Sequence, residues 1–322
     1  MNIKVNKSAS SNLLMENLFY KSISVFLFLR RKKIKRVLTI LFLFGLTCCP
    51  TEFIAYAEQD KTPGTVIKDA DYFTNLGHSH AESGKYEAAI EAYKQAISIK
   101  PENAEAYFNL GLVYQSSAKF QKAIDAYKQT IKINPDYAEA HYNLGLAYRA
   151  SRRERDAFDS YMRAIEINPD YAEAYYSLGH LYRSSGNFQE AIKAYQKVIK
   201  IMPDNAKAYY SLGHTFGKLG KNKEVIVAYK KAIEIDPDYT VAYYNLARTY
   251  RESGDYQDAV DAYKQVIRLK PDDANSHYDL GTTYLKLENR DAASNQYEIL
   301  KDLDIKLANK LFNEIGLLNK KN

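Results

Sequence analysis

The chain has 322 residues, of which 26% are charged and 46% hydrophobic, and its formal net charge is +6 at pH 7. The positive charge is concentrated at the N-terminus, because residues 1–57 hold nine Lys or Arg against two Asp or Glu. The remainder is close to neutral and lacks the basic excess that phosphate binding needs, so no nucleic acid partner is expected. Both cysteines, Cys48 and Cys49, lie in the same N-terminal stretch. The rest of the chain therefore offers no disulfide, thiol nucleophile or cysteine metal site.

Residues 1–57 have the pattern of a secretory signal peptide. Six bases fall within residues 30–36, ten mostly apolar residues follow at 37–46, and an A-x-A cleavage site ends at Ala57. We therefore expect an exported protein, periplasmic or extracellular. The alternative is a membrane anchor in an uncleaved leader, although Pro50 interrupts the apolar run well before the roughly 20 residues that a span needs.

Residues 58–69 are polar, contain a Pro-Gly pair and read as a short linker. From residue 70 a unit of 34 residues repeats seven times. Glycines keep this step at Gly77, Gly111, Gly145, Gly179, Gly213 and Gly281, with Ala247 in the remaining slot. A fixed period of this length is typical of a solenoid, in which each unit contacts only its neighbours.

Each unit predicts two helices. With Ala104 as position 1, the apolar stripe of the first helix occupies positions 4, 7, 8 and 11, which have i, i+3, i+4, i+7 spacing. Gly at position 8 and Ala at position 20 are small and predict close packing of the pair. Gly at position 15 predicts a left-handed end to the first helix in four units. The other three units carry Ala118, Arg152 and Glu288 there, and we expect their turns to differ in detail.

This pattern resembles the tetratricopeptide repeat, and the resemblance covers about three-quarters of the chain. It implies an all-α fold: an α-α superhelix, or solenoid, of seven helix pairs over residues 70–303. Residues 304–322 are expected to form a C-terminal capping helix and tail. The apolar stripe predicted to face unit seven consists of Leu307, Leu311, Phe312 and Ile315.

The candidate binding residues lie on the first helix of each unit, at positions away from the predicted core. Position 5 is aromatic in six units, and position 6 is mostly Asn or Ser, which are mediocre residues in a helix interior. In the family this helix lines a concave groove, and an asparagine at position 6 contacts extended peptide backbone in arrays such as those of O-linked N-acetylglucosamine transferases. The resemblance carries that role to Asn75, Asn109, Asn143 and Asn245. The alternative is that these residues merely belong to the repeat.

Tyrosine and arginine are typical interface anchors and extend this candidate groove. The tyrosines at position 5 are Tyr142, Tyr176, Tyr210 and Tyr244, and the arginines at position 12 are Arg149, Arg183 and Arg251. Their clustering suggests a groove suited to a polar or acidic peptide. His180 and His214 share position 9 of neighbouring units and could form a zinc or pH-sensing pair, but no carboxylate cluster accompanies them. We interpret them as polar groove residues.

No nucleophile elbow, phosphate loop or metal motif is present in the sequence, so we expect no catalytic residue, cofactor or metal. The leading hypothesis is a non-catalytic module that binds a peptide segment or partner protein in the concave groove. The alternatives are a membrane-anchored assembly factor, with membrane contact only if the leader is uncleaved, and a recognition subunit for an enzyme on another chain.

Overall fold

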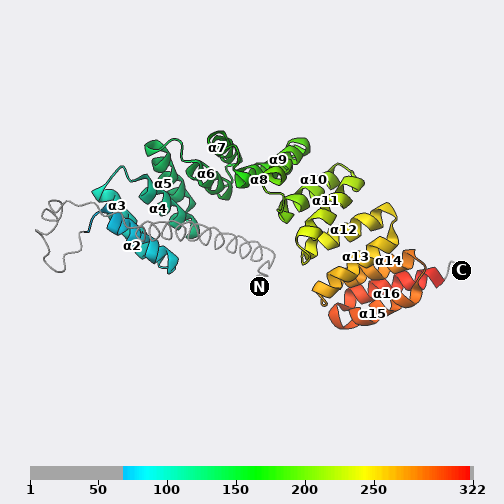
Figure 1. Cartoon of the computed structure of the whole chain (residues 1–322). Helices are drawn as coiled ribbons and strands as arrows, with labels where there is room; N and C mark the ends of the chain where they lie inside the picture. Colours follow the sequence, from blue (N-terminus) through cyan, green and yellow to red (C-terminus); the bar gives the residue numbers. More distant parts are fainter. Residues whose placement is uncertain (1–67, 320–322) are drawn as a thin grey trace, which may run out of the picture. The chain divides into compact units, whose positions relative to one another are not determined.

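The computed structural model describes residues 68–319, and over this range the chain forms fifteen α-helices and no strand (Figure 1). They form seven consecutive antiparallel pairs and one further helix. The first helices are α2 (Ala70–Glu82), α4 (Ala104–Ser116), α6 (Ala138–Ala150), α8 (Ala172–Ser184), α10 (Ala206–Lys218), α12 (Thr240–Ser253) and α14 (Ala274–Lys286). The second helices are α3 (Tyr86–Ile99), α5 (Phe120–Ile133), α7 (Glu154–Ile167), α9 (Phe188–Ile201), α11 (Asn222–Ile235), α13 (Tyr256–Leu269) and α15 (Arg290–Leu303). The last helix is α16 (Ile305–Asn319).

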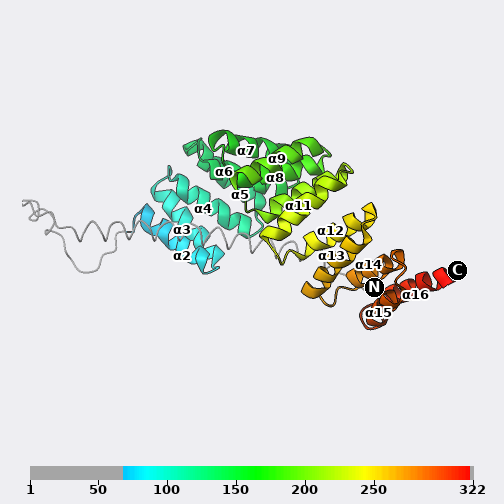
Figure 2. The ribbon, with the colours of Figure 1, turned by 45° about the vertical axis from the view of Figure 1, so that its right-hand side comes forward.

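The helices pack in chain order, as a solenoid requires. Each first helix contacts the second helix of its own unit, and each second helix contacts the first helix of the next unit (Figure 2). The predicted all-α solenoid of seven pairs and a final helix is therefore confirmed. The predicted signal peptide and most of the predicted linker lie outside the described residues. None of the described helices is both long and apolar enough to cross a membrane.

Position 8 has no room for a side chain in most units, because a tyrosine ring from the second helix occupies the space beside it. A Cβ atom built on Gly77, Gly111, Gly145, Gly179 or Gly213 would lie 2.5–2.8 Å from the ring of the tyrosine at position 24 of the same unit. These rings are nearly or fully buried. The alanines at position 20 are also fully buried in all six units that carry them. In these five units the expected close packing of the pair thus depends on a glycine–tyrosine contact that the spacing alone did not reveal.

The turns without glycine at position 15 follow the same path as those with it, so the expected difference between them is wrong. Ala118, Arg152 and Glu288 have φ values of 55°, 59° and 58°, in the left-handed region that glycine occupies in the other four units. The hydrogen bonds agree, since Lys119 N donates to Tyr114 O just as Lys85 N donates to His80 O. The packing of the two helices fixes this turn, and three side chains bear the resulting strain.

Helix α16 closes the end of the array. It packs against α14 and α15, and Asp304 caps its N-terminus by accepting hydrogen bonds from the backbone of residues 306 and 307. Leu311 is fully buried, and its Cδ2 atom would lie 2.5 Å from a Cβ atom on Gly281. In unit seven this leucine therefore fills the place that a tyrosine ring fills elsewhere. Phe312 was expected in the buried stripe, but 56% of its surface is exposed. Its ring centroid lies 5.3 Å from that of Tyr297.

Candidate functional site

Positions 5 and 6 of the first helices meet across the boundaries between units. The Tyr176 hydroxyl lies 3.2 Å from the Ser211 hydroxyl. Asn245 Nδ2 donates to the Tyr210 hydroxyl at 3.1 Å. The Tyr244 hydroxyl donates to Asp279 Oδ2 at 2.8 Å. From unit four to unit seven, the candidate binding residues therefore form hydrogen bonds that join each unit to the next.

The position-5 rings also pack inward. In units two to six their centroids lie 5.5–5.9 Å from the ring of the tyrosine at position 24 of the same unit. Tyr142 is only 6% exposed, and its ring also lies 5.0 Å from that of Tyr171. Tyr142, one of the tyrosines assigned to the candidate groove, therefore packs into the core. Tyr176, Tyr210 and Tyr244 are half-buried.

The four asparagines of the candidate groove differ in what they contact. Asn245 is used within the chain, since its Nδ2 atom also donates to the Val241 carbonyl at 2.9 Å. Asn143 Nδ2 donates to the carbonyl of Glu139, one turn earlier, at 2.8 Å. Asn75 is exposed, Asn109 is half-buried, and neither side chain makes a hydrogen bond within the described residues.

Whether a position-6 side chain bonds across the unit boundary depends on the residue at position 5 of the preceding unit. Asn109 follows Thr74 and Asn143 follows Phe108 at position 5, and neither residue has a phenol that could reach across the boundary. Thr74 is moreover buried and accepts a hydrogen bond from Asn103 Nδ2 at 3.2 Å. The inter-unit bond therefore forms only where a tyrosine precedes. In the described part of the chain, the amides of Asn75 and Asn109 keep unused donors and acceptors.

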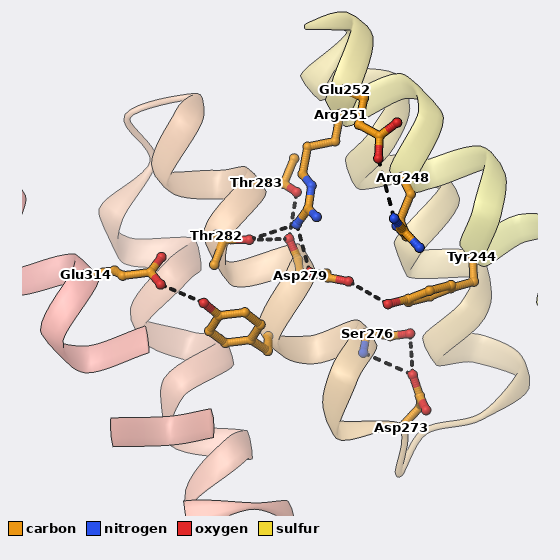
Figure 3. Close-up of polar contacts among 11 residues, drawn as sticks. Tyr244, Arg248, Arg251, Glu252, Asp273, Ser276, Asp279, Thr282, Thr283 and Glu314 are labelled. Atoms are coloured by element: carbon orange, nitrogen blue, oxygen red, sulfur yellow. Dashed lines mark hydrogen bonds and ion pairs between the residues drawn. The ribbon is translucent and has the colours of Figure 1, made fainter. Parts of the chain in front are cut away.

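Arg251 contacts unit seven rather than a free surface (Figure 3). Its Nη1 atom donates to Asp279 Oδ1 at 2.7 Å and to Thr282 Oγ1 at 3.2 Å. Asp279 is 8% exposed and also accepts the Tyr244 hydroxyl. Burial and the bond to this carboxylate raise the pKa of Tyr244 to about 12. Asp279 occupies position 6 of unit seven, where its charge sets it apart from the Asn and Ser of the other units, but the sequence does not reveal its ion pair with Arg251.

Arg183 is held differently, between two histidines. Its Nη1 atom lies 3.0 Å from His214 Nδ1, and its Nη2 atom lies 3.2 Å from His180 Nδ1. A guanidinium can only donate, so both Nδ1 atoms accept, and each imidazole carries its proton on Nε2. Arg183 forms no salt bridge within residues 68–319. The expectation that His180 and His214 lie on one surface is confirmed, with an arginine between them.

The surroundings keep both imidazoles neutral. Burial lowers the pKa of His180 to about 4, assisted by the charges of Arg183 and Arg149 and by His214. Burial, Arg183 and Lys218 also lower the pKa of His214. The described part of the chain contains no group of three or more His, Cys, Asp or Glu side chains placed to hold a metal ion.

The charges near the first helices change sign along the array. In the first units, Glu105 and Glu82 add to burial in raising the pKa of Tyr93, and Glu139 and Glu105 do the same for Tyr137. Around Arg183, on the first helix of unit four, the charges are cations. Arg183 opposes the rise that burial causes in the pKa values of four tyrosines there, and Arg149 or Arg248 acts with it on two of them. The surroundings of Tyr93 and Tyr137 are therefore acidic, and those of Arg183 are cationic.

Two family descriptions match this chain over most of its helical part. Models described as TPR repeat match residues 77–117, 119–150, 179–220 and 247–288. Models described as Tetratricopeptide repeat match residues 138–171, 206–239, 160–193 and 228–261. Together these ranges cover more than half of the chain. The chain belongs to the tetratricopeptide repeat family.

Two solved tetratricopeptide repeat proteins share the fold. The C-terminal part of a TPR repeat-containing protein from Cytophaga hutchinsonii aligns with a TM-score of 0.66 at 18% identity, over 76% of this chain and 99% of its own. YrrB, described as a TPR protein with an unusual peptide-binding site, aligns with a TM-score of 0.51 at 21% identity, over 58% of this chain and 96% of its own. MamA is 34% identical over 52% of this chain and 92% of its own, with a TM-score of 0.49. No curated protein matches the chain. Membership of the family makes this chain a protein–protein interaction module.

Proposed function

We propose that this tetratricopeptide repeat protein is exported and non-catalytic, and that it binds an extended segment of a partner protein along its first helices, which line the concave groove of the superhelix. One observation carries the proposal. Along a single register, the hydrogen-bonding groups are used within the chain at Ser211, Asn245 and Asp279. Those of Asn75 and Asn109 are unused within residues 68–319. YrrB, which shares the fold, is itself described as peptide-binding.

An extended peptide offers the partners that these amides lack. Each asparagine side chain can donate through Nδ2 and accept through Oδ1, which matches the carbonyl and N–H groups of one peptide segment. In the free protein, Asn143 Nδ2 donates to the Glu139 carbonyl. The Oδ1 atom of Asn143 is then the group that would accept a hydrogen bond from a peptide N–H. The three N-terminal units are therefore the proposed backbone-binding part of the groove.

The test replaces Asn75, Asn109 and Asn143 with alanine in the full chain and measures binding of a partner captured by the parent protein. Each neutral hydrogen bond lost should cost about 0.5–1.5 kcal/mol of binding free energy, or up to roughly tenfold in Kd. Helicity should be retained, because alanine is the better helix former. The matched control replaces Asn309 and Asn313, two exposed asparagines within α16. Equal affinities of the two variants would remove the asparagines from the binding site.

Export is tested separately by N-terminal sequencing of the protein purified from its natural host. The proposal predicts a mature chain that starts at Glu58. A chain that still carries residues 1–57 in the membrane fraction would instead support an anchored assembly factor.

A further inference from the structure

The unusual setting of Arg183 gives the proposed groove a chemical preference. We propose that Arg183, held between His180 and His214 at the boundary of units four and five, binds an acidic side chain of the partner segment. This inference rests on the proposed function, because it names the kind of peptide that the groove accepts.

The guanidinium of Arg183 is held in a fixed geometry. A guanidinium has five N–H donors, and the two imidazoles take up two of them. Within residues 68–319, the structure pairs Arg183 with no carboxylate, whereas Arg251, at the same position two units later, is paired with Asp279 at 2.7 Å. His180 of unit four and His214 of unit five both hold the guanidinium. Arg183 therefore has little side-chain entropy left to lose when it binds a ligand. A planar fork fixed in this way suits a carboxylate, which can accept two parallel N–H bonds.

The groups that support Arg183 carry no negative charge. Structural arginines are usually held by carboxylates, which neutralise them. Neutral imidazoles orient Arg183 without cancelling its charge. The edge-on contact of the His180 ring with Tyr176, at 4.6 Å between centroids, fixes that imidazole in turn. The site is therefore preorganised and keeps its positive charge.

The charges around Arg183 are complementary to an acidic side chain. The charged groups that face His180 are Arg183 and Arg149, those that face His214 are Arg183 and Lys218, and none of them is an acid. The same holds for Tyr176, which senses Arg183 and Arg149. An anionic side chain that enters this site would meet several cations and no like charge, whereas a basic or apolar side chain would gain nothing from them.

The experiment uses the histidines as reporters. The full chain has only six, so selective ¹³C labelling of histidine gives six Cε1–H signals in NMR spectra, and His180→Gln and His214→Gln assign the two that matter. The probes are two peptides of glycine and serine with blocked ends, one with two central glutamates and the other with two glutamines. Thymidine hexanucleotide is the third probe, because phosphate could also meet an arginine.

Addition of the glutamate peptide should shift the His180 and His214 signals and raise both apparent pKa values, because a carboxylate offsets the cations that now oppose imidazole protonation. The glutamine peptide should leave both signals in place. Arg183→Gln should weaken binding of the glutamate peptide by tenfold or more. Arg183→Lys should weaken it as well, since the charge remains but the fork is lost. The matched control is Arg268→Gln, which removes an exposed arginine that also donates to a neutral side chain, Gln265, on the second helix of unit six.

Equal shifts with the glutamate and glutamine peptides, or equal affinities of Arg183→Gln and Arg268→Gln, would overturn the proposal. Tighter binding of the oligonucleotide than of the glutamate peptide would also overturn it. A different result would contradict the proposed function while leaving the carboxylate site intact. If the three-asparagine variant keeps full affinity for the captured partner while Arg183→Gln loses affinity for the glutamate peptide, the carboxylate site stands and the asparagine groove does not.

Discussion

Removal of the Asp279 carboxylate should destabilise the boundary between units six and seven. The side chains of Asp279 and Arg251 are 12% and 28% exposed, so the pair is largely shielded from water. Asp279→Ala deletes the bond from Arg251, worth about 1.5–3 kcal/mol because it involves charge, and the bond from Tyr244, worth about 1 kcal/mol. We expect the free energy of unfolding to fall by about 3 kcal/mol.

Asp279→Asn provides the comparison. Its Oδ1 atom can still accept from Arg251, and its Nδ2 atom can donate to the Tyr244 hydroxyl, as Asn245 Nδ2 does to that of Tyr210. Both hydrogen bonds survive and only the charge is lost, so the cost should be about 1 kcal/mol.

Urea unfolding followed by circular dichroism measures both values, and amide exchange should show the first loss of protection in α14, α15 and α16, because each unit of a solenoid depends on its neighbours. If the costs of Asp279→Ala and Asp279→Asn differ by less than about 0.5 kcal/mol, the hydrogen bonds of Asp279 do not stabilise this boundary, and the reasoning is refuted.

Four further predictions concern single positions. Ala118→Gly should raise the free energy of unfolding by about 1 kcal/mol in urea titrations, since alanine is strained at φ 55°, and Gly84→Ala should lower it. Leu311→Ala should lower it by about 2–5 kcal/mol and favour aggregation in light scattering, because a buried side chain of the cap is removed. Phe108→Tyr should slow amide exchange at the boundary of units two and three, because the new phenol can accept from Asn143; unchanged exchange would contradict the rule drawn from units four to seven. Because the pKa of His180 is lowered to about 4, the unfolded chain binds this proton first as the pH falls from about 6.5. Stability should therefore drop between pH 6.5 and 4, by up to about 3 kcal/mol, and His180→Gln should flatten the curve.

The fold was predictable because the same information is written seven times. Gly at position 8, Ala at position 20 and Pro at position 32 each have a local physical reason, and the period relates them to one another. The turn at Ala118 was not predictable, because a left-handed alanine goes against local propensity and only the packing of two helices enforces it.

The candidate site was predictable in location and less so in chemistry. Positions 5 and 6 were identified as unusual for a helix, but a periodic sequence does not reveal that the phenol of one unit reaches position 6 of the next, 35 residues later. The same limit applies to position 12. Arg183 and Arg251 are equivalent in sequence, yet one is held by His180 and His214 and the other by Asp279. Of these partners, His214 and Asp279 come from the following unit.

The proposal that the first helices carry the binding surface is tested most directly by photo-crosslinking in the full chain. A benzophenone amino acid is placed at Asn109 on α4, and in a second protein at Gln129, an exposed position on α5 of the same unit. After irradiation in the natural host, mass spectrometry identifies the crosslinked partner and its segment. We predict a specific partner segment from position 109 and none from position 129; the reverse pattern would contradict the proposal that the first helices bind the partner.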